Sequence, residues 1–343
     1  MHPFSKIVSI LLLTIVLFAC NNKKREDAPV FYFWKTTYEL TEIEKLTLKQ
    51  LQCEKMYVRL FDVEWDTQSK SPMPMAKLKT IDTLNKFKIV PVVYFNDEVF
   101  LNIEDSAIIL LAQKVAEQID IMAANRDFDF NEYQIDCDWT ASSKKRYFEF
   151  LVQIKKILAH KTLNCTLRFN QIKHRKKLGI PPADKGTVLF YNMGKLTAKL
   201  SDNSIYNDKD AKQYSKCIQN YSLRLDAALP IFSWAIQCRK DSIVNLLPRR
   251  ELLDFADTSI FLYDGKYIRV KQNSFYKGVL FKINDYIKLE TISEEDCEKA
   301  AKILAKNAPK AGFENILYFD LDEKTITRFN HEKIRDLHVL LPN

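Results

Sequence analysis

Glycine is scarce in this 343-residue chain, which contains only six. Even the closest two, Gly179 and Gly186, are too far apart for a glycine-rich phosphate loop of the Walker or dinucleotide-binding type. Those loops need clustered glycines because their backbone passes so close to phosphate that a Cβ atom would collide. The composition therefore argues against ATP- and NAD-dependent chemistry, and we expect no cofactor.

Metal-ligand spacings are also missing. The five histidines never occur as His-x-His or His-x-x-x-His, and no Cys-x-x-Cys is present. Such spacings bring zinc ligands together on a strand, a helix or a turn. We therefore expect no dedicated metal site.

A long basic tract in the body of the chain is the third absence. The formal net charge of +8 comes from 52 basic and 44 acidic residues, which are mixed along the sequence. The main basic run is short, at residues 174–177, and a solvated surface explains such a run more often than nucleic-acid binding does. We expect no nucleic-acid partner.

The start of the chain carries a targeting pattern. Residues 1–20 contain a basic Lys6, an apolar run from Ile7 to Phe18 that is too short to span a bilayer comfortably, and then Ala19 and Cys20. The ending Leu-Phe-Ala-Cys resembles the lipobox of bacterial lipoproteins, in which the cysteine becomes the lipidated first residue. The resemblance implies a signal peptide over 1–20 and lipidation of Cys20.

The residues after Cys20 fit a protein held at a membrane. Residues 21–29 are polar and charged, which predicts a tether between the lipid and a folded domain. We therefore expect a lipid-anchored protein of the cell envelope, in the periplasm or on the outer surface, with the membrane as a partner. An uncleaved anchor is the alternative and also leaves the body of the chain outside the cytoplasm. That compartment permits disulfides, but Cys137 and Cys165 lie in apolar runs and favour buried free thiols.

From residue 30 onward, short apolar runs alternate with amphipathic stretches. Strands are predicted at 30–35, 56–65, 89–95, 133–138, 164–169, 187–193, 228–234 and 315–321. Helices are predicted at 41–53, 76–87, from 105 onward, 142–158, 208–221 and 293–307. Eight strands joined in this way predict an α/β fold, a (β/α)8 TIM barrel over 30–343. A doubly wound open sheet is the structural alternative.

The alternation breaks once, at residues 258–290. Two apolar runs there are split by Asp264-Gly265, a pair typical of a hairpin turn. We expect a β-hairpin insertion before the last helix and strand of the barrel.

The fourth predicted strand holds the central candidate residues. Because side chains alternate along a strand, Gln134, Asp136 and Asp138 share one face, whereas Ile135 and Cys137 share the other. In a barrel the acidic face points to the axis near the C-terminal rim, where active sites lie. The alternative is an ordinary antiparallel strand with its polar face in water.

Aromatic and polar side chains are predicted at the same rim. All four tryptophans fall at strand ends, and indole faces suit the C–H faces of sugar rings, while carboxylates and amides bind the hydroxyls. The alternative for one or two of them is a purely structural place in the core. The candidate substrate-binding residues are Trp34, Trp65, Tyr94, Asn96, Trp139, Arg168, Asn170, Tyr191, Trp234 and Asp322. For Arg168, a structural ion pair with Asp136 is an equal alternative.

Glycoside hydrolysis needs one protonated carboxylic acid and a second group that acts as base or nucleophile. Alternate residues on one strand stand about 6.5–7 Å apart, so Asp136 and Asp138 are close enough to raise one pKa. Asp138, nearer the rim, is the candidate acid and Asp136 its tuning neighbour. Asp320 or Glu64 is the candidate second carboxylate.

Three further segments carry a family resemblance. Together with the lipobox, Phe33–Thr36, Tyr57–Trp65 and Tyr133–Trp139 resemble a family of bacterial, Bacteroidetes-type lipoproteins related to glycoside-hydrolase-like TIM barrels. The resemblance implies the barrel and a carbohydrate-related role, but no particular reaction. Asp136-x-Asp138 also looks like part of the Asp-x-Asp-x-Glu signature of chitinase-type barrels. This chain has Thr140 where that signature has its catalytic glutamate, which puts chitinase-like catalysis in doubt.

Two functions therefore remain open. The first is a glycosidase of the cell envelope that acts on a polysaccharide or a peptidoglycan-like glycan. The second is a non-catalytic glycan-binding or assembly lipoprotein on the same scaffold. In either case we expect a glycan as substrate or ligand, and a monomer.

Overall fold

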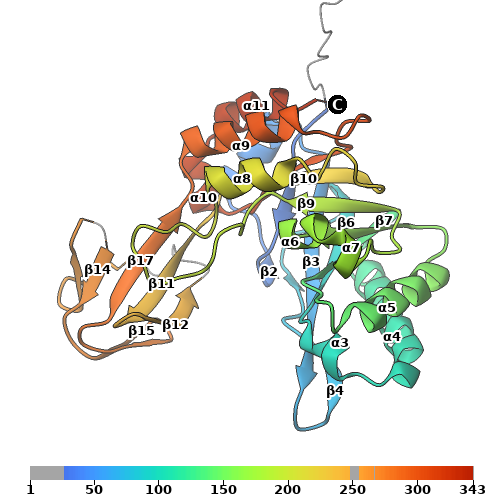
Figure 1. Cartoon of the computed structure of the whole chain (residues 1–343), viewed down its shortest axis with the longest axis horizontal. Coiled ribbons are helices and arrows are strands. Elements are labelled where there is room, and N and C mark those ends of the chain that lie inside the picture. The colour runs from blue at the N-terminus through green and yellow to red at the C-terminus, as the bar shows by residue number, and fades with distance from the viewer. Residues whose placement is uncertain (1–26, 248–254, 266, 343) are drawn as a thin grey trace, which may run out of the picture.

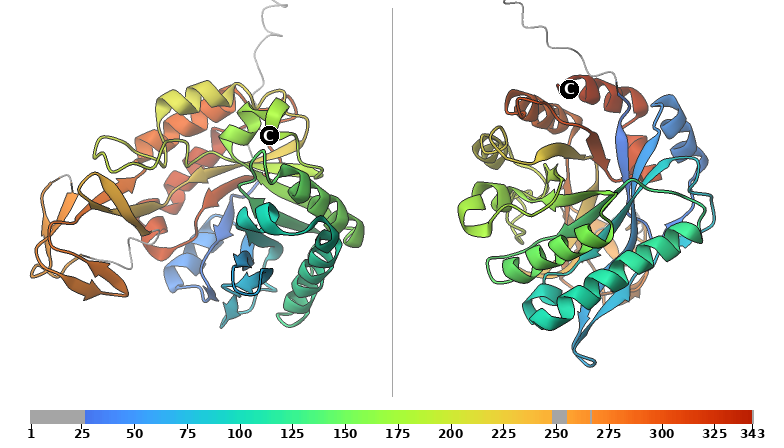
Figure 2. Two further views of the ribbon diagram at one scale, coloured as in Figure 1. Left: turned by 60° about the horizontal axis from the view of Figure 1, so that its bottom comes forward. Right: turned by 90° about the vertical axis from the view of Figure 1, so that its right-hand side faces the viewer.

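Eight parallel strands form a closed ring in the computed structural model, which describes residues 27–247, 255–265 and 267–342. The order around the ring is β1–β18–β10–β9–β8–β7–β6–β3, and β3 pairs back with β1. The strands are β1 (Val30–Phe33), β3 (Lys55–Asp66), β6 (Lys88–Phe95), β7 (Glu132–Cys137), β8 (Thr162–Leu167), β9 (Lys185–Leu189), β10 (Arg224–Pro230) and β18 (Ile316–Phe319). With helices outside the ring (Figures 1 and 2), the predicted (β/α)8 TIM barrel is confirmed. The predicted signal peptide and Cys20 lie outside the described residues.

The helices cover the outer surface of the ring. They are α2 (Glu42–Gln50), α3 (Glu98–Asn102), the 3-10 helix η2 (Asp105–Ala107), α4 (Ile108–Ala124), α5 (Lys144–Ile157), α6 (Phe169–Lys173), α7 (Arg175–Leu178), α8 (Asp208–Ser215), α9 (Glu294–Lys306), α10 (Glu323–Arg328) and α11 (His331–Val339). The Ser293 hydroxyl accepts from Asp296 N and caps the start of α9, as the sequence pattern predicts. Within the described ranges no helix is long and apolar enough to cross a bilayer.

The helix predicted at 76–87 is wrong. Strand β3 continues beyond the ring and returns as the antiparallel β4 (Ser71–Met75), and the short β5 (Lys79–Thr80) then pairs with β2 (Thr37–Tyr38). Leu78 N donates to Leu60 O at 2.7 Å, and Lys79 N donates to Thr36 O at 2.9 Å. These bonds to neighbouring segments take the N–H groups that a helix would use internally.

The insertion begins earlier than the predicted residue 258. A five-stranded antiparallel sheet has the order β12–β11–β17–β14–β13 and stands beside the barrel (Figure 1). Its strands are β11 (Ser233–Arg239), β12 (Ser242–Leu247), β13 (Phe261–Tyr263), β14 (Tyr267–Val270) and β17 (Tyr286–Thr291), with a separate hairpin of β15 (Ser274–Tyr276) and β16 (Val279–Phe281). Buried residues such as Phe261, Phe281 and Ile287 give it a small core of its own. Because β10 ends at Pro230, Trp234 lies on the first strand of this sheet, not on the seventh barrel strand as predicted.

The N-terminal part of the barrel interior is filled by a charged network. Lys185, 2% exposed, holds its Nζ 2.9 Å from Asp226 Oδ2 and 3.2 Å from Glu132 Oε1. The Tyr57 hydroxyl donates to Glu132 Oε1 at 2.6 Å. Buried charges are tolerated here because each has a partner.

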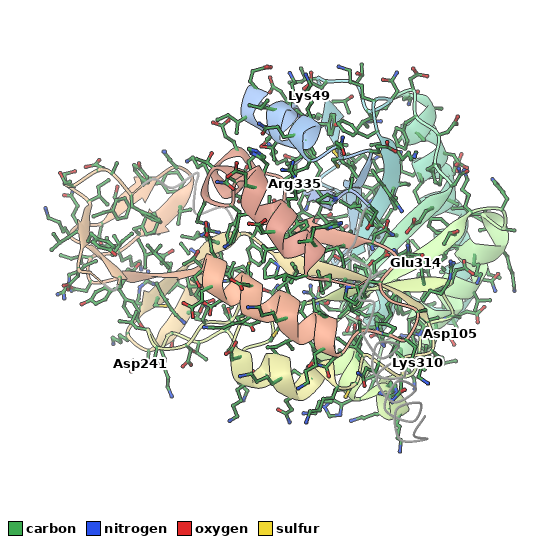
Figure 3. The ribbon with its side chains drawn as sticks, turned by 90° about the horizontal axis from the view of Figure 1, so that it is seen from above. Lys49, Asp105, Asp241, Lys310, Glu314 and Arg335 are labelled. Atoms are coloured by element: carbon green, nitrogen blue, oxygen red, sulfur yellow. The ribbon has the colours of Figure 1, made fainter. Side chains whose placement is uncertain are left out.

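Helices α2 and α11, the first and last that the structure describes, pack together on the outside of the ring. Arg335 on α11 donates from Nη2 to Gln50 O, the last residue of α2, at 2.8 Å. Figure 3 shows Arg335 and Lys49 on these two neighbouring helices. This contact joins the first and last described helices across the outside of the ring.

Candidate functional site

A cavity of about 580 Å³ opens among the C-terminal ends of the barrel strands and the start of the insertion. Of the predicted site residues, the following line it: Trp34, Tyr94, Asp136, Arg168, Tyr191, Trp234, Asp320 and Asp322. Its volume is typical of a small-molecule site. The sequence therefore located the mouth of the barrel correctly, although not every member of its lining.

Asp136 shows that the predicted phase of β7 is right. The preceding inward residue, Gln134, accepts from the Tyr32 hydroxyl at 2.8 Å and donates to Thr187 Oγ1 at 2.9 Å across the barrel interior. Asp136 lines the cavity above it, is 6% exposed, and accepts from Thr166 Oγ1 at 2.6 Å. Burial raises the pKa of Asp136 to about 6, although the Arg168 guanidinium opposes the shift. This carboxyl therefore changes its protonation within a physiological pH range.

Asp62 is a second buried carboxyl in the same cavity. The ladder between β3 and β6 has a bulge between Arg59 and Phe61, so Arg59 and Asp62 both face inward although they are three residues apart. Arg59 Nη1 lies 3.3 Å from Asp62 Oδ2. Burial raises the pKa of Asp62 to about 6, against the opposing charge of Arg59. The cavity thus holds two carboxyls whose pKa values lie near 6.

Asp138, the candidate acid, lies outside this cavity. Strand β7 ends at Cys137, and the Asp138 side chain, 50% exposed, lines a neighbouring depression of about 430 Å³. Its Oδ1 accepts from Arg168 Nε at 2.5 Å. Arg168 borders both hollows, so its ion pair forms with Asp138 and not, as weighed from the sequence, with Asp136.

Two tryptophans wall the main cavity. Trp34 follows directly after β1, and the Arg59 guanidinium lies over its ring, 5.4 Å from the centroid. Trp234 donates from Nε1 to Glu290 Oε2 at 2.7 Å, its cross-strand neighbour on β17. Both indoles are thereby fixed in orientation, which reduces the entropy lost when a ligand stacks on them.

The other two tryptophans do not line the cavity. Trp139 is 2% exposed, donates from Nε1 to Leu178 O at 3.1 Å and stacks on Tyr147 of α5. Trp65 lies on the extension of β3, paired with Pro72 of β4. The prediction that all four tryptophans form one rim is therefore wrong. Trp139 packs in the core against α5, and Trp65 lies on the part of β3 that extends beyond the ring.

Three polar candidates are also outside the main cavity. Glu64 is exposed on the β3 extension opposite Met73. The Asn96 side chain makes a local hydrogen bond instead, in which its Oδ1 accepts from Glu98 N at 3.0 Å. Asn170 belongs to α6 and lines the neighbouring depression with Asp138 and Trp139.

Several lining residues were absent from the predicted site. Arg59, Asp62 and Thr166 are polar, and Phe232 and Phe319 add to the aromatic wall. If Arg59 faces inward, regular alternation predicts that Asp62 faces outward. The bulge after Arg59 reverses that alternation and turns Asp62 inward. Strand alternation does predict the inward position of Thr166, because it lies two residues after the inward-facing Asn164 on β8.

Neither hollow has the donor set of a metal centre. Across residues 27–247, 255–265 and 267–342, no group of three or more His, Cys, Asp or Glu side chains is arranged to hold a metal ion. The six cysteines of these ranges are free thiols, and Cys137 and Cys165 are buried behind the inner face of the barrel.

Known structures share this architecture. No protein-family model and no curated protein matches the chain. The spore cortex-lytic enzyme SleL of Bacillus cereus superposes with a TM-score of 0.53, at 12% identity, over 94% of this chain and 76% of that chain. A mutant GH18 chitinase from Cycas revoluta, in complex with (GlcNAc)4, superposes with a TM-score of 0.51, at 10% identity, over 91% and 99%. The chain shares the (β/α)8 barrel fold of these two structures. At these identities the likeness establishes the fold.

Proposed function

We propose that this protein is a lipid-anchored glycosidase of the cell envelope that binds a glycan in the barrel-mouth cavity and hydrolyses it there. The observation that carries the proposal is Asp136, a nearly buried carboxyl that lines a hollow walled by Trp34 and Trp234. Burial keeps this carboxyl protonated to a higher pH than an exposed aspartate, while the indoles offer faces for sugar rings. The same cavity therefore offers a carboxyl for acid–base catalysis and aromatic faces for sugar binding.

The position of Asp138 favours Asp136 as the acting residue. Asp138 is half exposed and accepts a hydrogen bond from Arg168 beside a different depression. In this proposal Asp138 and Arg168 form the charged border of the site, and the reaction takes place on the side of Asp136.

A non-catalytic glycan-binding role is the second candidate, and one observation favours it. Thr140 stands where the chitinase-type signature has its glutamate, and it lines the neighbouring depression rather than the main cavity. A barrel that kept its aromatic walls but lost hydrolysis would use the acids only to bind hydroxyl groups.

Hydrolysis assays separate the two roles. The release of reducing ends is measured for the wild type and for Asp136→Asn on the N-acetylglucosamine tetramer, on purified peptidoglycan and on neutral glucan and xylan oligosaccharides. The enzyme proposal predicts release from at least one of these and a loss of at least 100-fold in Asp136→Asn. Binding of an oligosaccharide without release by the wild type would establish the binding role instead.

The anchoring proposal has its own test. The wild type and Cys20→Ser are expressed in a bacterium, and the membrane and soluble fractions are compared after removal of the signal peptide. Lipidation of Cys20 predicts that the wild type stays with the membrane and that only the variant is released or left unprocessed. Equal distribution of the two proteins would contradict it.

A further inference from the structure

We propose that Asp62 is the catalytic partner of Asp136 and that the protein inverts the anomeric configuration of its substrate. The inference rests on the proposed hydrolase function and names the pair of side chains that performs it. It replaces the same-strand pair Asp136 and Asp138, and the partners Asp320 and Glu64, which the sequence pattern favours.

Register places the two carboxyls on one level of the barrel. Asp62 on β3 pairs with Tyr94 on β6, and Tyr94 pairs with Asp136 on β7. Two strand intervals separate the Cα atoms of Asp62 and Asp136 by about 9–10 Å, and inward-pointing side chains in a ring converge. Inverting glycosidases hold their carboxyls roughly 6.5–9.5 Å apart, whereas retaining ones use about 5–5.5 Å. Spacing across two strands therefore fits the inverting arrangement, which leaves room for a water molecule.

Asp62 also has an oxygen without a partner. The side chain of Asp62 is only 11% exposed and lines the cavity, and one of its oxygens faces Arg59. The other, Oδ1, is buried and has no hydrogen-bond partner in the part of the chain that the structure describes. A buried polar atom without a partner is unfavourable, so such an atom in a cavity commonly marks a ligand contact.

The other acids of the mouth have different positions. Asp322 is the N-cap of α10 and accepts from Lys324 N at 3.2 Å. Glu64 is exposed and does not line the cavity. Asp320 lines the cavity but is less buried than Asp62. Asp62 combines burial, an oxygen without a partner and a register position on the level of Asp136.

The local contacts assign one role to each residue. Asp136 accepts a short hydrogen bond of 2.6 Å from Thr166 Oγ1, which favours its carboxylate form and the role of base. Asp62 accepts only a longer bond of 3.3 Å from Arg59, through Oδ2, and its Oδ1 is left to carry the proton of an acid. Asp62 donates its proton to the glycosidic oxygen as the bond from that oxygen to C1 breaks. Asp136 takes a proton from water as the water oxygen bonds to C1 on the opposite face. The products are one new reducing end and one free hydroxyl, and transfer of a proton from Asp136 to Asp62 through solvent restores the pair.

The test uses the full chain and the glycan panel described above. The anomer released first by the wild type is identified by proton NMR, and kcat is measured for Asp62→Asn, Asp136→Asn and the control Asp129→Asn. Asp129 is exposed in the segment before β7, at the far end of that strand from the cavity. The inference predicts an inverted product, a fall in kcat of about 100- to 10,000-fold in both cavity variants, and wild-type activity in the control.

The possible failures are distinguishable. A retained anomer, or a folded Asp62→Asn protein with wild-type kcat, overturns the pairing and leaves the hydrolase proposal standing. If Asp62→Asn does not fold, the wild-type anomer alone decides between the two arrangements. Absence of hydrolysis by the wild type on every member of the panel overturns the hydrolase proposal and the pairing together.

Discussion

Arg168 donates from Nε to Asp138 Oδ1 at 2.5 Å, and this ion pair stands between the main cavity and the neighbouring depression. The Asp138 charge raises the pKa of Asp136, whereas the Arg168 charge lowers it. Besides burial, the groups that shift the pKa of Asp136 are therefore Arg168, Asp138, Thr166 and Asp62. Asp138 is a border residue that tunes the site electrostatically.

The first prediction follows from this pair. In Asp138→Asn the repulsive charge is gone and Arg168 is free to act on Asp136, so the pKa of Asp136 falls. Because Asp136 acts as a base only when ionised, the acidic limb of the pH–kcat profile moves to lower pH while hydrolysis persists. The measurement is that profile for both proteins. Loss of all activity in a folded Asp138→Asn protein would instead support Asp138 as the acid.

The second prediction concerns stability. The pKa of Asp136 is about 6 in the folded protein and 3.8 in the reference state, so the native state binds more protons between these values. The contribution of Asp136 to stability therefore decreases as the pH rises from about 4 to 6. At pH 8, Asp136→Asn removes the buried charge, and we expect it to be more stable than the wild type by about 1–3 kcal/mol. Denaturant unfolding at pH 8 and pH 4 tests this, and the difference should nearly vanish at pH 4.

The third prediction separates two tryptophans that the sequence treats alike. Trp139→Ala removes a buried ring and its bond to Leu178 O, and we expect a loss of about 3–5 kcal/mol in unfolding free energy. Trp234→Ala lies at the cavity wall, so we expect weaker glycan binding with a smaller effect on stability. Calorimetric titration and thermal unfolding of both variants check this, and the reverse pattern would show that Trp139 faces the ligand.

The fourth prediction concerns the network below the site. Lys185→Met leaves Asp226 and Glu132 in the interior without their shared cation, and we expect a loss of about 3–5 kcal/mol. The matched control is Lys145→Met, since Lys145 pairs with Asp105 on the surface and should contribute little. Urea unfolding of both variants makes the comparison, and similar small losses would show that the buried cation is dispensable.

The same network predicts sensitivity to acid. Despite burial, Lys185 and Lys55 lower the pKa of Glu132 to about 2, from a reference value of 4.5. A depressed carboxyl pKa stabilises the folded state above the reference value and loses that contribution as the pH falls toward 2. Thermal unfolding of Glu132→Gln and the wild type from pH 7 down to pH 2.5 tests this. The variant should show a shallower decrease in midpoint over that range.

Strand alternation carried most of what the sequence could predict. The number of apolar runs predicts the eight strands of the ring, and the alternation of polar and apolar residues predicts the inward face of β7. Asp136 lies on that face, as predicted. Periodicity failed where the backbone departs from regularity. A bulge after Arg59 turns Asp62 inward, and the early end of β10 moves Trp234 onto the insertion.

Local hydrogen bonds account for the remaining differences. Asn96 and Asp138 are polar residues just beyond strand ends, where side-chain direction is set by the nearest partner rather than by the pleat. Asn96 accepts a hydrogen bond from Glu98 N, and Asp138 accepts one from Arg168. Neither partner can be identified from a single sequence, because each depends on how the loop after the strand turns.

The position of a bound glycan tests the central claim most directly. The measurement is a crystal structure of Asp136→Asn soaked with the glycan that the wild type cleaves or, failing cleavage, binds. The account predicts a sugar ring between Trp34 and Trp234, with an oxygen of the ligand in contact with Asp62. A glycan bound in the depression beside Asp138 and Trp139, with the main cavity empty, would contradict it.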